Sequence, residues 1–308
     1  YIPTDFGTPT DFAASSPDSW SHLVDVARAA DRVGIDRVLV SDHVVFGADL
    51  SDYGRPEVGG TRGGRQPTGP DGQWLDPLVV LSWVASHTNR VRLGTSILLA
   101  AIRRPVSLAK TLATLDVLSG GRLDVGVGVG WQRAEYEAAG LDFDTRGSLL
   151  DHSLAVMRAL WGPDPVDFAD ERLTLSSVYA DPKPIQPGGV PMWISGTVNP
   201  AVARRIARFG TGWITWGEAA RDPGAAIARM RDLVDHVGGD ASSLRVSAPL
   251  PGVTSDAGVF DVAATFEHVP RLVAAGVTDL QLAVRLSGSQ DRIEATLRSV
   301  VEALAAVA

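Results

Sequence analysis

The strongest constraint on the fold is an alternation of short β-type runs with longer helical stretches along nearly the whole chain. Ile2 and Pro3 give the tail of one such run, and seven more occupy residues 37–41, 91–99, 123–129, 191–195, 212–216, 244–248 and 279–284. Strands that alternate with helices indicate βαβ units and a parallel sheet. About eight of these units predict an α/β protein built as a single (β/α)8 TIM barrel.

The boundaries of the helical stretches repeat the same residue types. A capping side chain followed by proline occurs at Ser16-Pro17, Asp76-Pro77, Asn199-Pro200 and Asp222-Pro223. The side-chain oxygen accepts from an unpaired N–H of the first helical turn, and proline has no N–H to leave unpaired there. Glycines expected to end helices in the left-handed conformation stand before strands at Gly34, Gly120, Gly210 and Gly276. This recurrence favours repeated βα units over two unrelated domains.

No stretch has the composition of a linker, so we expect one domain over residues 1–308. Three longer segments, residues 45–75, 130–145 and 162–190, interrupt the alternation, and each follows a strand or its helix. Barrel enzymes elaborate their active-site rim with insertions at the C-terminal ends of strands. The first segment is rich in glycine, which predicts a mobile lid over that rim.

Composition narrows the classes of function. A chain of 308 residues with 45% hydrophobic residues fits one large barrel domain. The absence of cysteine excludes disulfides, thiolate nucleophiles and cysteine-ligated metals. A net charge of −8 argues against nucleic acid or an anionic membrane as partner, because both are bound by basic surfaces. We expect a cytoplasmic protein, since no run approaches the roughly 18 apolar residues of a membrane-spanning helix. We expect its substrate to be a small molecule.

One histidine occupies a position where barrel enzymes place catalytic groups. The run at residues 37–41 ends in Ser41-Asp42-His43, and an imidazole at a strand end can donate or accept a proton near neutral pH. Asp42 is either a group that orients His43 or a structural hydrogen-bond acceptor. The other five histidines fall in helical stretches, where structural roles are expected. His43 with Asp42 is therefore the candidate catalytic pair.

Two other barrel chemistries lack the residues they need. Metal-dependent hydrolysis needs convergent imidazoles and carboxylates, and the chain has no pair of histidines close in sequence. A serine hydrolase with a nucleophile elbow needs Gly-x-Ser-x-Gly, which does not occur. We therefore expect neither a metal site nor a serine nucleophile.

Glycine alternates along one predicted strand, at Gly126, Gly128 and Gly130, directly before Trp131. Glycine inside a strand costs packing and backbone entropy, so three in alternation imply that something approaches the backbone closely. Two interpretations stay open: a large flat ligand against the strand, or a crowded barrel interior.

A small-residue turn, Ser195-Gly196-Thr197, joins a predicted strand to a capped helix. Such a turn presents backbone N–H groups at the positive end of a helix, which is an anion site. It lies late in the barrel, where phosphates commonly bind. Thr211 and Gly212, which open the next strand, are expected to close the other side of the same pocket.

These segments, in their order and spacing, resemble the luciferase-like flavin and deazaflavin oxidoreductases over nearly the whole chain. Residues 76–131 carry the densest likeness, and Ser41-Asp42-His43, Pro182-Lys183-Pro184 and Gly212-Trp213 add to it. The matching motifs in the dense stretch are Arg92-Leu-Gly-Thr-Ser-Ile97, Arg104-Pro105, Ala109-Lys110, Leu115-Asp116 to Arg122, and Gly126-Val-Gly-Val-Gly-Trp131.

The resemblance implies a tricyclic cofactor at the C-terminal mouth of the barrel. It places a bulge with a non-proline cis peptide at Ser96-Ile97, behind the cofactor, and the cofactor phosphate near Gly196. The implied cofactor-binding residues are Ser96, Ile97, Gly128, Gly130, Trp131, Ser195, Gly196, Thr197, Thr211 and Gly212. The pattern is most similar to members that use the deazaflavin coenzyme F420, so we expect F420, with FMN as the alternative.

The function implied by the resemblance is hydride transfer between F420 and a small organic substrate, catalysed by a homodimer. Sugar-phosphate dehydrogenases of this kind carry tryptophan and glutamate where this chain has Gly47 and Trp131, which argues against their substrate. The alternatives are an FMN-dependent monooxygenase that uses O2 and reduced flavin, and a non-catalytic cofactor-binding protein. The F420 tail carries extra carboxylates, which rim arginines are expected to meet: Arg55, Arg62, Arg65, Arg103 and Arg104.

Overall fold

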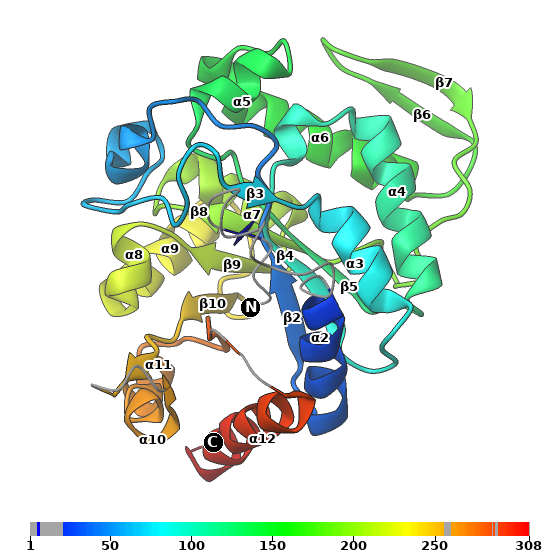
Figure 1. The fold of residues 1–308 in the computed structure, drawn as a ribbon. Helices are drawn as coiled ribbons and strands as arrows, with labels where there is room; N and C mark the ends of the chain where they lie inside the picture. The colour runs from blue at the N-terminus through cyan, green and yellow to red at the C-terminus, as the bar shows by residue number, and fades with distance from the viewer. Residues whose placement is uncertain (1–4, 7–20, 256–259, 285, 287–288, 308) are drawn as a thin grey trace.

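The computed structural model describes residues 5–6, 21–255, 260–284, 286 and 289–307. Its main sheet contains seven parallel strands in the spatial order β13-β10-β9-β8-β5-β4-β2, so neighbours in space are successive along the chain (Figure 1). This order confirms the expected α/β fold with a parallel sheet. The strands are β2 (Arg37–Val40), β4 (Arg92–Leu98), β5 (Leu123–Val127), β8 (Met192–Gly196), β9 (Gly212–Thr215), β10 (Arg245–Pro249) and β13 (Asp279–Gln281).

Helices surround the outer face of this sheet (Figure 1). The last of them, α12 (Gln290–Val307), packs against α2 (Ser21–Val33), and Arg32 and Glu294 form an ion pair of 2.7 Å between the two helices. The helices are α2 (Ser21–Val33), α3 (Pro77–Ala85), α4 (Pro105–Leu118), α5 (Arg133–Ala138), α6 (Arg146–Leu160), α7 (Pro200–Phe209), α8 (Glu218–Arg221), α9 (Pro223–His236), α10 (Val262–Phe266), α11 (Val269–Ala274) and α12 (Gln290–Val307).

Side chains from the two edge strands meet, which shows that the sheet is strongly curled. Arg37 on β2 and Asp279 on β13 approach to 3.9 Å, although β2 and β13 are the two edge strands. Ser96 on β4 donates to the side-chain oxygen of Gln281 on β13 over 3.3 Å. The eighth strand expected at Ile2 and Pro3 lies outside the described residues. The structure therefore shows a curled sheet of seven strands, and closure into a complete eight-stranded barrel stays a prediction.

The helix boundaries follow the expected signals in part. Asp76 and Asn199 each accept from two backbone N–H groups of the first turn, as predicted. Asp222 makes no such bond, and Ser16-Pro17 lies outside the described residues. Gly210 is extended at φ −83°, so the left-handed ending expected there is wrong. The other three predicted glycines are left-handed, as expected: Gly34, Gly120 and Gly276.

The insertions form small structures of their own. The segment at residues 162–190 contains the antiparallel hairpin of β6 (Val166–Ala169) and β7 (Thr174–Val178). The segment at residues 45–75 contains two 3-10 turns and β3, which pairs with β1. Two strands of two residues each, β11 and β12, form a further antiparallel pair. The bounds of these elements are η2 (Ser51–Gly54), η3 (Pro56–Val58), β1 (Asp5–Phe6), β3 (Gln73–Trp74), β11 (Val253–Thr254) and β12 (Phe260–Asp261).

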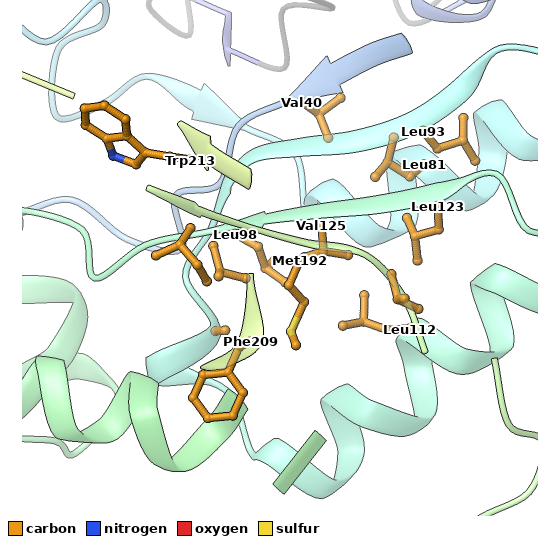
Figure 2. Packing of buried hydrophobic residues seen from close by; sticks show 14 of the residues in the cluster. Val40, Leu81, Leu93, Leu98, Leu112, Leu123, Val125, Met192, Phe209 and Trp213 are labelled. Atoms are coloured by element: carbon orange, nitrogen blue, oxygen red, sulfur yellow. The ribbon is translucent and has the colours of Figure 1, made fainter. Parts of the chain in front are cut away.

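The hydrophobic core fills the space between the sheet and its helices (Figure 2). Leu93 and Leu123 on neighbouring strands are fully buried, as are Leu81 on α3 and Leu112 on α4. Truncating one such leucine to alanine removes buried contacts and leaves a cavity, which costs about 3 kcal/mol. The sheet is thus a rigid base that fixes the positions of its strand ends.

Charged side chains close the N-terminal ends of the strands. Asp124 on β5 accepts from Arg37 over 2.9 Å and from Arg92 over 2.6 Å. The ring of Trp193 lies between two guanidinium groups, at 5.2 Å from Arg37 and 4.9 Å from Arg245. Because these pairs come from strands on both halves of the sheet, they hold its curl at this end.

Candidate active site

The predicted site residues gather at the C-terminal ends of four neighbouring strands. His43 follows β2, Ser96 lies near the end of β4, Gly130 follows β5, and Gly196 ends β8. These strands are adjacent and parallel in the order β8-β5-β4-β2, so their C-terminal ends form one continuous rim. The fold thus brings these four residues to one rim.

The predicted bulge is present in β4. The Ser96-Ile97 peptide is cis, as expected, and the pairing of β4 with β5 shifts register between Thr95 and Leu98. Ser96 and Ile97 are half-buried, whereas Thr95 and Leu98 are buried. The bulge therefore exposes part of its surface at the rim.

His43 is held by a residue that the sequence interpretation did not single out. Its Nδ1 lies 3.2 Å from Oε1 of Glu135, on the short helix α5 that follows β5. The same oxygen accepts from the backbone N–H of Val44 over 2.9 Å. Only 1% of the Glu135 side chain is exposed, against 12% for His43. A buried carboxylate thus contacts the imidazole at the rim.

Aromatic rings surround His43 on its other sides. Phe46 and Trp74 each lie 4.6 Å from the imidazole centroid, and Trp131 lies 6.1 Å away. Tyr53 packs edge-on against Trp131 at 5.2 Å. Burial raises the pKa of Tyr53, so its hydroxyl stays neutral near pH 7. Phe46, Trp74 and Trp131 thus form an apolar aromatic wall beside the imidazole of His43.

Side chains that follow β5 hold the loop that carries His43 in place. Oε1 of Gln132 accepts from the N–H of Gly47 over 2.6 Å, and Nε2 of Gln132 donates to the carbonyl of Val45 over 3.3 Å. Gln132 is buried, as is Glu135. These two side chains fix residues 43–47 relative to β5.

The hydrogen bonds of the Asp42 side chain go to residues other than His43. Its carboxylate accepts from the N–H of Leu99 over 2.9 Å and from Nη2 of Arg103 over 3.0 and 3.1 Å. Burial raises the pKa of Asp42, while Arg103 and the Leu99 N–H act in the opposite direction. Of the two roles that the sequence left open for Asp42, these contacts favour the structural acceptor.

The alternating glycines of β5 contact protein atoms. A Cβ at Gly126 would lie 2.2 Å from the carbonyl oxygen of Thr95, and one at Gly128 would lie 3.1 Å from the Ile97 side chain. A Cβ at Gly130, which is left-handed at φ +69°, would lie 2.7 Å from Leu99. These contacts favour the crowded-interior interpretation, because the glycines make room for the bulge of β4.

The turn predicted at Ser195-Gly196-Thr197 is present, but the two sides expected for its pocket are separated. Gly196 pairs with Thr215, whereas Gly212 pairs with Trp193 at the other end of the same two strands. Three residues of strand span about 10 Å, so Thr211 and Gly212 do not face Thr197. The residue that does is Gly217, whose Cβ would lie 3.5 Å from the Thr197 methyl.

The arginines expected at the rim differ in the side chains that they contact. Nη1 of Arg103 donates to Asp76 over 3.0 Å in addition to its bonds with Asp42, so this guanidinium is part of the scaffold. Arg104 lines a groove of about 310 Å³ between α3 and α4, outside the sheet. Arg62, in contrast, is exposed and pairs with Glu218 beyond the end of β9.

No group of three or more histidine, aspartate or glutamate side chains suited to a metal ion occurs in the described part of the chain. Within the same ranges, no helix is both long and apolar enough to cross a membrane.

Comparison with known proteins identifies the family. The model of the luciferase-like monooxygenase family matches residues 3–257. This chain belongs to that family. Among luciferase-like relatives, the chain is 32% identical over 232 residues to the uncharacterised protein Rv0953c of Mycobacterium tuberculosis, covering 75% of this chain and 76% of the relative. It is 34% identical over 235 residues to the F420-dependent glucose-6-phosphate dehydrogenase of Mycobacterium tuberculosis, covering 69% of this chain and 62% of that enzyme.

Solved luciferase-like structures share the fold. An F420-dependent secondary alcohol dehydrogenase, in complex with an F420–acetone adduct, superimposes with a TM-score of 0.72 at 19% identity, covering 93% of this chain and 95% of that one. The oxygenating constituent of 3,6-diketocamphane monooxygenase from Pseudomonas putida, in complex with FMN, gives a TM-score of 0.67 at 15% identity, with 94% of each chain covered. The fold therefore occurs with both cofactors.

Proposed function

We propose that this protein is an F420-dependent oxidoreductase that transfers a hydride between the deazaflavin and a small organic substrate. The observation that carries the proposal is the juxtaposition of the half-buried bulge at Ser96-Ile97 with a carboxylate-held imidazole at His43 on the same rim. Homology to an F420-dependent dehydrogenase at 34% identity supports the choice of cofactor.

The residues at the rim fit a tricyclic cofactor with a phosphate. Ile97 offers apolar surface at the bulge, and the turn at Ser195, Gly196 and Thr197 offers polar groups next to the start of α7. Asn199 already accepts from the N–H groups of residues 201 and 202, so a phosphate would bind at the turn ahead of this cap. The cofactor, when bound, supplies the hydride chemistry.

His43 supplies the proton chemistry in this proposal. Nδ1 of His43 contacts Glu135, so Nε2 is the nitrogen left for a substrate. Among the described residues, none forms a hydrogen bond with Nε2. This nitrogen donates a proton to, or removes one from, the substrate atom next to the carbon that exchanges hydride. The aromatic wall of Phe46, Trp74 and Trp131 excludes water from that transfer.

A titration with both cofactors tests the proposal. Intrinsic tryptophan fluorescence is followed while F420 or FMN is added to the same protein preparation. We expect tighter binding of F420 and turnover that is lost in His43→Ala while F420 binding is kept. Tighter binding of FMN, with O2-dependent turnover, would favour the monooxygenase alternative instead. Binding without any turnover by the unmodified protein would favour a non-catalytic cofactor-binding protein.

We infer that exposed arginines of the 45–75 segment would recognise the F420 tail. Arg62 and Arg65 are exposed in the 45–75 segment, and Arg62 pairs with Glu218 beyond the end of β9, whereas Arg103 is held by two carboxylates. Replacing Arg62 and Arg65 together by alanine should weaken F420 binding by about 1 kcal/mol, because exposed ion pairs contribute little each. FMN binding should not change. Arg104→Ala, which removes a charge from the outer groove, is the control and should affect neither cofactor.

We further propose that the protein is a homodimer that buries one apolar face. Seven of the twelve exposed large apolar side chains in the described residues lie on α3, α4 and the segment from β7 to residue 185, which form one side of the molecule (Figure 1). Both neighbouring hollows, of about 250 and 310 Å³, open on the same elements. The side chains are Val79, Trp83, Val106, Val117, Leu118, Tyr179 and Ile185.

A further inference from the structure

We propose that Glu135 is a positioning residue that fixes the tautomer and orientation of His43. The proposal rests on the proposed function for its catalytic consequence, but its structural part can be tested on the protein without cofactor or substrate. It departs from the sequence interpretation, in which Asp42 was the only carboxylate offered as a partner for the imidazole.

The first argument is the direction of the hydrogen bond. A carboxylate only accepts, so the Nδ1 that lies 3.2 Å from Glu135 must carry a proton. In a neutral ring this leaves Nε2 unprotonated, ready to accept a proton from a substrate. An unrestrained imidazole exchanges between both tautomers. Glu135 therefore selects the form in which the substrate-facing nitrogen is the base.

The second argument is the burial of the contact. The Glu135 side chain is 1% exposed, so water cannot replace the imidazole as its donor. Its second donor is the N–H of Val44, the residue next to His43, at 2.9 Å. Losing a donor from a buried carboxylate is costly. The pair of bonds therefore ties the backbone and the ring of the same loop to one oxygen.

The third argument is the packing around the ring. Phe46 lies at 4.6 Å with its plane tilted by 40°, and Trp74 lies at 4.6 Å almost edge-on at 80°. Both come from the chain segment that follows His43. With Trp131 at 6.1 Å, three aromatic rings and one carboxylate contact the imidazole, which keeps 12% of its side chain exposed. A ring flip would leave Glu135 facing a C–H group, so the observed orientation is favoured.

Gln132 provides a control that the chain itself contains. It clamps the same loop through Gly47 and Val45 and is buried like Glu135, yet it has no bond to His43. A role of Glu135 that is limited to holding the loop would be shared by Gln132. A role that acts through the imidazole would be confined to Glu135.

The test uses protein labelled with 15N in histidine, and two-bond 1H–15N correlation spectra recorded at a pH where the ring is neutral. His43→Asn identifies the signals of His43 among the six histidines. We expect the Nδ1–H tautomer in the unmodified protein. Glu135→Leu should move His43 mainly to the Nε2–H form, and Glu135→Gln should populate both, because an amide donates as well as accepts. Gln132→Leu should keep the Nδ1–H form.

Steady-state kinetics of the same variants complete the test. Glu135→Leu and Glu135→Gln should lower kcat about 10- to 100-fold, as removing the residue that orients a metal-binding histidine does, with KM for the cofactor changed less than about threefold. A resting Nε2–H tautomer, or an equal tautomer shift in Gln132→Leu, would overturn the proposal. If the unmodified protein has no turnover with F420 or FMN, the proposed function fails, whereas the spectra still decide the role of Glu135.

Discussion

Replacing Asp42 by alanine should destabilise the fold by about 4 kcal/mol, and the loss has two sources in the structure. The buried N–H of Leu99 would lose its acceptor, which costs about 2 kcal/mol. Arg103 would lose one of its two carboxylates. Breaking a buried ion pair costs about 3–5 kcal/mol, reduced here to about 2 kcal/mol because Asp76 remains and the guanidinium side chain is 22% exposed.

Urea unfolding followed by circular dichroism measures this loss, and a thermal scan should show a decrease in Tm of about 8 °C for a domain of this size. Asp42→Asn keeps an acceptor for Leu99 and should lose about half as much. Removing both charges, in Asp42→Leu with Arg103→Met, should recover part of the stability. If Asp42→Asn unfolds like the unmodified protein but loses turnover as fully as His43→Ala, the structural interpretation of Asp42 is refuted.

Three further outcomes are expected. Gly126→Ala should destabilise by about 3 kcal/mol in urea unfolding, because the new Cβ would lie 2.2 Å from a backbone oxygen of Thr95, whereas Gly224→Ala, in a helix with the nearest atom at 3.9 Å, should be neutral or stabilising. Partial burial raises the pKa of Asp31, but three backbone N–H groups and Arg90 lower it to a net value below 3.8. Asp31→Asn should therefore be about 1 kcal/mol less stable at pH 7, and the difference should vanish as the pH falls through the folded pKa; a difference that persists at pH 2 would contradict this. Tyr179→Asp, on the exposed apolar face, should convert a dimer to a monomer in light scattering, and an unmodified protein that is already monomeric would exclude the dimer.

The order of the elements could be predicted from the sequence, because strand and helix signals are local. Residues 92–98 and 123–127 lie within predicted strands, and the caps at Asp76 and Asn199 depend only on the next three residues. The Ser96-Ile97 cis peptide was also predicted, through family resemblance and not through a local physical signal. Gly210 shows the limit of such local signals, since its backbone is extended and a Cβ there would lie 3.2 Å from Ile194 on β8.

The partners of the site residues could not be predicted. Arg103 lies 61 residues from Asp42, and Glu135 lies 92 residues from His43, so neither contact leaves a local trace. Helix α5 has only six residues, too few for periodicity to tell which of its acidic side chains is buried. The pocket expected between Gly196 and Gly212 was misplaced for a related reason, because the register of β8 and β9 depends on tertiary pairing.

The charged layer at the N-terminal ends of the strands has a kinetic consequence. Arg37, Asp124 and Trp193 occupy that end of the curled sheet, so a ligand bound at the opposite, C-terminal strand ends would not leave past these side chains. When two ligands use the same opening and one lies deeper, the deeper ligand cannot exchange while the other is bound. If F420 rests on the bulge at Ser96-Ile97 and the substrate lies above it, cofactor must enter first and leave last. Product-inhibition patterns should then be those of a compulsory order, and the exchange of bound cofactor should stop at saturating substrate.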